Sequence, residues 1–66
     1  MKVHLREWRR RRLLSQRDLA KKAKVGLSTI VRVEKEGYRP TMRTLRRLAK
    51  ALDIESDQLV DWEDEA

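Results

Sequence analysis

The stretch Ser15–Pro40 constrains the fold of this chain more than any other part of its sequence. It reads SQRDLAKKAKVGLSTIVRVEKEGYRP, and its apolar spacing predicts two short amphipathic helices, at about 16–23 and 27–35. Ser15 is expected to cap the first helix, with Asp18 as its capping-box partner three residues on. The stretch therefore predicts two helices with a defined start, separated by very few residues.

The turn between these helices is Lys24-Val25-Gly26, in which Gly26 is expected to cap the second helix and Val25 to anchor the bend. The small side chain of Ala20 allows the second helix to cross closely. Glu36-Gly37-Tyr38-Arg39-Pro40 breaks the helical pattern. The other residues expected to face inward are Leu19, Ala23, Ile30 and Val33.

Helical spacing also predicts the rest of the chain. Leu5 and Trp8, with Leu13 or Leu14, form the inner face of a helix at about 3–12. Further helices are expected at about 42–52, capped by Thr41, and at about 56–62, with 63–66 as an acidic tail to a domain of residues 1–62. No alternating pattern supports a strand. The expected fold is all-α, a compact bundle of four to five helices.

The size of the chain and its lack of cysteine exclude several classes of protein. Sixty-six residues make one domain near the lower limit for a self-sufficient core. Without cysteine, and with His4 as its only histidine, it has no disulfide and too few ligands for a structural zinc ion, so we expect no metal or cofactor. No apolar run is long enough to span a bilayer, and MKVHLREW is unlike a signal peptide, so a cytoplasmic protein is expected.

Charge is unevenly distributed along the chain. Residues 1–54 hold all 17 Lys and Arg and five acids, a net charge of +12, whereas residues 55–66 hold six acids and no base, a net charge of −6. A basic body of this kind indicates a polyanionic partner such as nucleic acid. The alternative interpretation is a highly charged, solvated helical surface.

In its order of motifs the chain resembles the phage repressor and Cro-like (Xre-like) helix-turn-helix family, over roughly Leu5 to Leu59. No single piece is diagnostic, but together, in order and at the family's spacing, they are a strong signal. The matching pieces are Leu5-Arg6, Trp8-Arg9, Leu14-Ser15-Gln16, Leu19-Ala20, Ala23, Val25, Ser28-Thr29-Ile30, Glu34, Pro40-Thr41, Thr44-Leu45 and Leu48-Ala49-Lys50-Ala51-Leu52.

This resemblance implies a lambda-repressor-like fold whose third helix enters the major groove of double-stranded DNA. Four residues match positions that face base edges in the family: Leu27, Ser28, Val31 and Arg32. Arg32 has the chemistry to bridge O6 and N7 of a guanine, whereas Leu27 and Val31 offer only apolar contact, for example to a thymine methyl. For Leu27 and Val31 the alternative is contact with protein, such as a dimer partner.

The resemblance also implies contacts to the DNA backbone, which position a protein without reading sequence. An alternative for Tyr38 is that its ring packs under the loop. The residues expected to hold phosphates are Gln16, Thr29, Lys35, Tyr38, Arg39 and Arg43.

Two further structural features follow from the same resemblance. Arg9 and Glu34 match a family pair that forms a salt bridge between the first helix and the end of the third. Leu13 and Lys24 stand where the family often has Gly, at helix ends with positive φ, so strain or a shifted boundary is expected there.

The function that the sequence predicts best is a DNA-binding transcriptional regulator, most simply a repressor that binds a palindromic operator as a homodimer. One alternative is a DNA-binding antitoxin that docks on a toxin, and another is a protein-interaction module on the same fold. Enzymatic activity is not expected, because the sequence shows no nucleophile–base pairing and no phosphate-cradling glycine loop.

Overall fold

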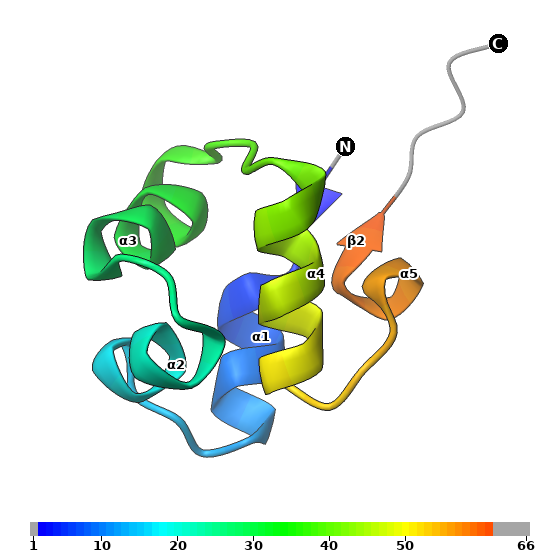
Figure 1. Cartoon of the computed structure of the whole chain (residues 1–66). Coiled ribbons are helices and arrows are strands. Elements are labelled where there is room, and N and C mark those ends of the chain that lie inside the picture. The colour runs from blue at the N-terminus through cyan, green and yellow to red at the C-terminus, as the bar shows by residue number, and fades with distance from the viewer. Residues whose placement is uncertain (1, 62–66) are drawn as a thin grey trace, which may run out of the picture.

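Five helices follow one another along residues 2–61, the part of the chain that the computed structural model describes (Figure 1). One pair of two-residue strands joins the two ends of this part. The helices are α1 (Leu5–Arg11), α2 (Gln16–Ala23), α3 (Leu27–Glu36), α4 (Met42–Ala51) and α5 (Ser56–Leu59), and the strands are β1 (Lys2–Val3) and β2 (Val60–Asp61). The all-α class is confirmed.

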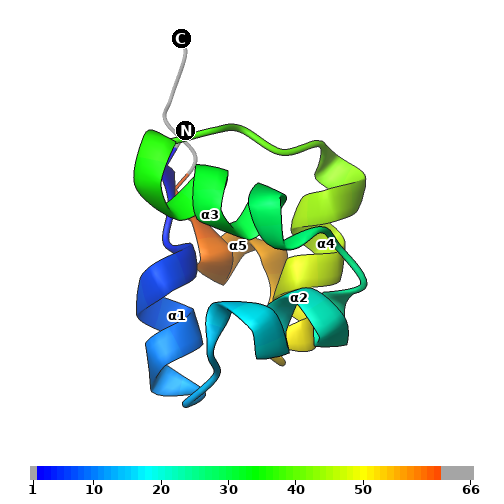
Figure 2. The same ribbon diagram turned by 90° about the vertical axis from the view of Figure 1, so that its left-hand side faces the viewer.

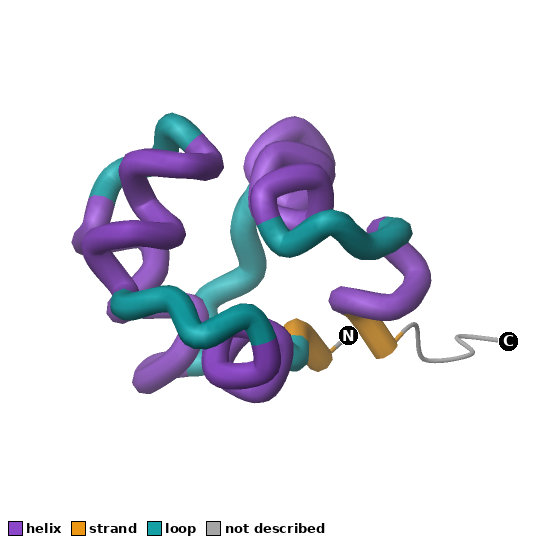
Figure 3. Tube along the Cα trace, turned by 90° about the horizontal axis from the view of Figure 1, so that it is seen from below, coloured by secondary structure: helices purple, strands orange, loops and turns teal. Residues whose placement is uncertain are grey.

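The helices are arranged around a shared apolar centre. Seen from below, α1 and α4 run nearly along the line of sight, with α2 and α3 on one side of them and α5 on the other (Figure 3). The buried core draws on every helix and on Val60 of β2. Its largest fully buried side chains are Leu5, Leu19, Ile30, Leu45, Leu48, Leu52 and Leu59.

The residues that cap the starts of α2, α3 and α4 are those that the sequence predicts. The Ser15 hydroxyl accepts a hydrogen bond from the Asp18 N–H at 3.0 Å, and the Asp18 carboxylate accepts one from the Ser15 N–H at 3.3 Å. Gly26 occupies the cap of α3 with extended backbone, and the Thr41 hydroxyl accepts from the Thr44 N–H at 3.2 Å. These local bonds satisfy backbone donors that have no partner within a helix.

The expectation that the chain forms no strand is wrong, as are the outer limits of the first and last helices. β1 pairs antiparallel with β2, with Lys2 opposite Asp61 and Val3 opposite Val60. With residues 2–3 in a strand, α1 begins at Leu5, and with residues 60–61 in the other, α5 ends at Leu59; at its far end α1 stops at Arg11. Two-residue strands are too short to show an alternating pattern, and contact between the two chain ends is set by the tertiary fold. Trp62 and residues 63–66 lie outside the described residues.

Among residues 2–61, three non-glycine residues follow helix ends in the left-handed conformation: Leu13, Lys24 and Asp53, with φ of 57°, 58° and 58°. The first two are the positions where the sequence led us to expect strain. Leu13 is 92% exposed, whereas Leu14 is half-buried and packs against the core. Leu14, rather than Leu13, therefore completes the inner face next to α1.

Candidate nucleic-acid interface

The outward face of α3 is open to solvent. In Figure 2 this helix lies across the front of the molecule, and no other described element covers it. Leu27, Ser28 and Arg32 are exposed on this face and Val31 is half-buried, while Ile30 on the opposite side is buried. The four residues expected to read bases therefore share one accessible strip of the helix.

The base-reading candidate Arg32 is in contact with Tyr38, one of the phosphate candidates. The guanidinium carbon of Arg32 lies 4.2 Å from the centroid of the Tyr38 ring. Gly37, with φ of 67°, turns the backbone so that the Tyr38 N–H donates to the Arg32 carbonyl at 3.2 Å. This contact was not predicted from the sequence, which indicated a base contact for Arg32 and a phosphate contact for Tyr38.

The other phosphate candidates flank this strip. Lys35 lies in the last turn of α3, Arg39 in the loop that follows, and Arg43 in the first turn of α4, and all three are exposed. Thr29, in the first turn of α3, is half-buried. Pro40 is buried within the same loop, which ties this basic segment of residues 35–43 to the body of the protein.

On the inner side of α3, Glu34 accepts hydrogen bonds from two other helices. Arg9 of α1 donates through Nε to Oε2 at 2.7 Å and through Nη2 to Oε1 at 3.0 Å. Gln16 of α2 donates to Oε1 at 3.2 Å, and Arg6 of α1 donates to the same oxygen at 3.3 Å. We call this cluster of Arg6, Arg9, Gln16 and Glu34 the Glu34 brace, because it ties α1, α2 and α3 together.

Opposing effects act on the ionisation of Glu34. Its side chain has no solvent exposure, and burial by itself raises the pKa of a carboxyl. The hydrogen bonds and charge of Arg9, helped by Gln16 and Arg6, outweigh burial and lower the pKa of Glu34 below its ordinary range. The hydrogen bond to Glu34 in turn raises the pKa of Arg9. The pair is therefore ionised near neutral pH.

Gln16 has a different environment from the one expected for a phosphate ligand alone. One of its amide N–H groups is directed at Glu34. A carboxamide carries two N–H donors and one acceptor, so this bond leaves a second donor for another partner. The sequence pointed to the pair of Arg9 and Glu34 but missed Gln16 and Arg6; the spacing of Arg6 and Arg9, three apart on one helix, was the available signal.

The run Arg9–Arg12 divides into separate structural roles. Arg12 donates to the Leu52 carbonyl at the end of α4, at 2.8 Å. Arg11 lies over the indole of Trp8, 4.8 Å from the ring centroid, and the Trp8 Nε1–H donates to the Gln58 carbonyl at 3.0 Å. Trp8 and Arg11 are thus on the α5 side of the molecule, away from α3.

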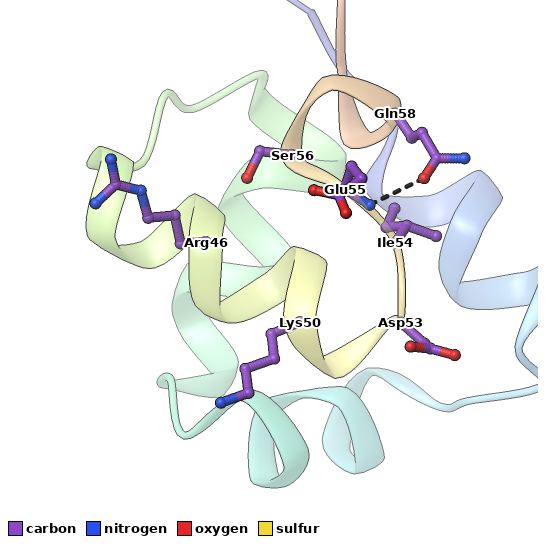
Figure 4. A pocket seen from close by; sticks show the side chains of 7 residues that line it. All are labelled: Arg46, Lys50, Asp53, Ile54, Glu55, Ser56 and Gln58. Atoms are coloured by element: carbon purple, nitrogen blue, oxygen red, sulfur yellow. Dashed lines mark hydrogen bonds between the residues drawn. The ribbon is translucent and has the colours of Figure 1, made fainter.

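Two depressions with charged residues in their lining lie away from the exposed strip of α3. One, of about 500 Å³, lies between the end of α2 and α4 and is lined by Lys22, Lys24, Arg47 and Lys50 with two alanines. The other, of about 380 Å³, lies where α4 meets α5 and carries both signs of charge (Figure 4). Its one drawn hydrogen bond, from the Glu55 N–H to the Gln58 amide at 2.9 Å, belongs to the capping box of α5. Neither depression touches the exposed strip of α3.

Within residues 2–61 no three His, Asp or Glu side chains gather closely enough to hold a metal ion. No helix of this part of the chain is long and apolar enough to cross a membrane.

Two helices that meet in a tight turn, the second exposed and followed by a basic loop, define a helix-turn-helix protein. Comparison with known proteins agrees: the helix-turn-helix family of the Cro/C1 type matches residues 5–59. An uncharacterized HTH-type transcriptional regulator of Archaeoglobus fulgidus is 34% identical over 65 residues, which is 98% of this chain and 93% of that protein. Another, of Methanocaldococcus jannaschii, is also 34% identical over 65 residues, 98% of each chain.

The chain belongs to the Cro/C1-type, Xre-like helix-turn-helix family. It is accordingly a DNA-binding transcriptional regulator and not an enzyme, as the sequence predicted.

Proposed function

We propose that this regulator is a repressor that binds a palindromic operator as a homodimer and reads it with α3 in the major groove. The observation that carries the proposal is the accessible strip of α3, which ends at Arg32, with the basic segment 35–43 beside it. Residues 1–62 form the DNA-binding domain in this proposal, with 63–66 as its acidic tail, and the site of action is DNA in the cytoplasm.

Four side chains supply the reading contacts. Arg32 donates two hydrogen bonds to one guanine, a contact worth roughly 1–3 kcal/mol of discrimination. Ser28 donates to or accepts from a neighbouring base, and the apolar Leu27 and Val31 contact thymine methyl groups. The 38% exposure of Leu27 supports this role, because a large apolar side chain at the start of a helix is then available to a partner.

Contacts to phosphate hold α3 in register. Lys35, Arg39 and Arg43 supply charge from the loop side, and the Tyr38 hydroxyl supplies a hydrogen bond. From the other side of the groove, Gln16 and Thr29 donate hydrogen bonds at the starts of α2 and α3. The Glu34 brace supports this arrangement, because it holds the start of α2 at a fixed distance from α3.

Twofold symmetry follows from how little one copy can read. A single recognition helix with four reading residues contacts too few base pairs to select one site in a genome, and a dimer doubles the number. The half-sites then lie one helical turn apart. A dimer bound there excludes other proteins from the same DNA, which is repression.

Selection of bound duplexes from a random pool tests the proposal. We expect an enriched palindrome with half-sites about 10 base pairs apart, and binding that weakens steeply with salt. Arg32→Ala should relax preference at one base pair of each half-site, whereas Arg11→Ala, the same change of charge on the α5 side, should leave the preference intact. A pool that yields no enriched duplex, as the interaction-module alternative predicts, would refute the proposal.

A further inference from the structure

We infer that Tyr38 is a positioning residue for sequence recognition: its ring holds the Arg32 guanidinium where it reads a base. The inference rests on the proposed function, and it adds a role for the ring that is separate from the phosphate contact of the hydroxyl. It assigns part of the sequence preference to a residue that touches no base.

The backbone at the end of α3 brings the two side chains together. Gly37, with φ of 67°, ends the helix in the left-handed conformation that glycine adopts without strain. The Arg32 carbonyl then accepts from the N–H groups of both Gly37 and Tyr38. This hydrogen bond keeps the Tyr38 backbone next to Arg32. The Tyr38 ring lies against the Arg32 side chain, with 4.2 Å between the ring centroid and the guanidinium carbon.

Stacking restrains the guanidinium without using its donors. A cation over an aromatic ring is attracted by the face of the ring and needs no hydrogen-bond acceptor there, and within the described residues the Arg32 guanidinium, which carries five N–H donors, makes no side-chain hydrogen bond. The fork that would bridge O6 and N7 of guanine therefore stays free. A long side chain that is already restrained loses less conformational entropy when it binds.

No other contact restrains Arg32 to a comparable degree within the described residues. Arg32 is exposed, and the Tyr38 ring is the one group against which its guanidinium is packed. Tyr38 is itself 37% exposed and lies outside the buried core, so its side chain can be changed without replacing a core residue. The pair is therefore suited to a test by substitution.

Two variants separate the ring from the hydroxyl. Tyr38→Phe keeps the ring and removes the phosphate hydrogen bond, so it should weaken binding to all duplexes about two- to fivefold and leave base preference unchanged. Tyr38→Leu removes the ring as well, and it should in addition reduce the preference at the base pair read by Arg32 by about three- to tenfold. In an Arg32→Ala background, Tyr38→Leu should cause no further loss of preference.

The measurement is the affinity of each variant for the selected duplex and for the duplex with that base pair exchanged. Arg39→Ala is the matched control, expected to weaken both duplexes equally. In the free protein, the NMR shifts of the Arg32 δ protons should show a ring-current displacement in the wild type and Tyr38→Phe, and none in Tyr38→Leu. This second readout requires no DNA.

Three results would overturn the inference: unchanged base preference in Tyr38→Leu, equal loss of preference in Tyr38→Phe, or additive losses from Tyr38→Leu and Arg32→Ala. A wild-type protein that selects a duplex while Tyr38→Leu behaves in one of these ways refutes the inference alone. A wild-type protein with no preference among duplexes refutes the proposed function, and the inference with it.

Discussion

Glu34 and Arg32 lie two residues apart on α3 and are charged side chains with opposite surroundings. The Glu34 side chain has no solvent exposure and accepts hydrogen bonds from α1 and α2. Arg32 is exposed, and its guanidinium contacts only the ring of Tyr38 among the described residues. The charged residue on the inner side of α3 is therefore bonded within the protein, and the charged residue on the outer side is available to a partner.

The difference explains how a short helix can be both fixed and available for binding. A buried carboxylate is tolerated only when its partners satisfy it, so the Glu34 brace requires α1, α2 and α3 to adopt one arrangement. An exposed arginine with free donors places no such demand on the fold. Substitutions on the inner side should therefore change stability, and those on the outer side should change DNA binding.

A substitution on the inner side, at Glu34, should change the protein most. Glu34→Ala removes the carboxylate partner of the half-buried Arg9, which keeps only its hydrogen bond to the Leu14 carbonyl, and should lower the free energy of unfolding by about 3 kcal/mol. In a domain of this size the thermal midpoint should fall by roughly 15 °C, measurable by circular dichroism. The double variant Arg9→Met with Glu34→Leu should recover part of this loss, because neither charge is then left buried alone. Full thermal stability in Glu34→Ala would contradict the brace.

Acid should weaken the same cluster. The pKa of Glu34 is lower in the folded than in the unfolded chain. The ionised Glu34 therefore contributes fully to the free energy of unfolding at pH values above the ordinary pKa range of glutamate. This contribution is lost as the pH falls below about 4.3 and through the lower folded pKa. Urea unfolding between pH 7 and pH 3 should show the free energy of unfolding falling with pH. In Glu34→Gln this free energy should fall less steeply. Identical slopes in the two proteins would indicate that other carboxylates cause the acid sensitivity.

On the outer side, Arg43→Ala should leave the thermal midpoint nearly unchanged and weaken DNA binding. Loss of one phosphate contact should reduce the dependence of log K on log salt concentration by about 0.9. Titrations at several salt concentrations measure this slope. Arg11→Ala, which removes the same charge on the α5 side, should keep the wild-type slope; an equal reduction in both variants would point to net charge as the cause.

The smallest expected effect lies at a site that belongs to neither side. Leu13 is 92% exposed with φ of 57°, so Leu13→Gly relieves a left-handed leucine without removing a buried contact. The greater freedom of glycine in the unfolded chain offsets part of the gain, which should be about 0.5 kcal/mol. Asp53→Gly, at φ of 58°, should gain less, because aspartate tolerates this conformation better. A destabilised Leu13→Gly would show that the leucine has a packing role.

Features that depend on neighbours within a few residues could be predicted from the sequence alone. The capping box of Ser15 and Asp18, the extended cap at Gly26 and the Thr41 cap follow from backbone chemistry within one helical turn. The inward positions of Leu19, Ile30 and Val33 follow from helical spacing, and all three are buried. The face of α3 that carries Arg32 is exposed as a consequence, because a helix that buries one side presents the other.

Contacts between groups far apart in the sequence could not be predicted and are set by how the chain packs. The pairing of β1 with β2, the bond from Trp8 to Gln58 and the arrival of Arg6 and Gln16 at Glu34 join residues 18 to 59 positions apart. Periodicity carries no information about such contacts, since they depend on how the helices cross. The stacking of Tyr38 on Arg32 is nearer in sequence, but it depends on the left-handed turn at Gly37 and on the rotamers of two exposed side chains. Sequence spacing shows which side of a helix faces outward. The crossing of helices and the turns between them decide which other groups contact the side chains on each side.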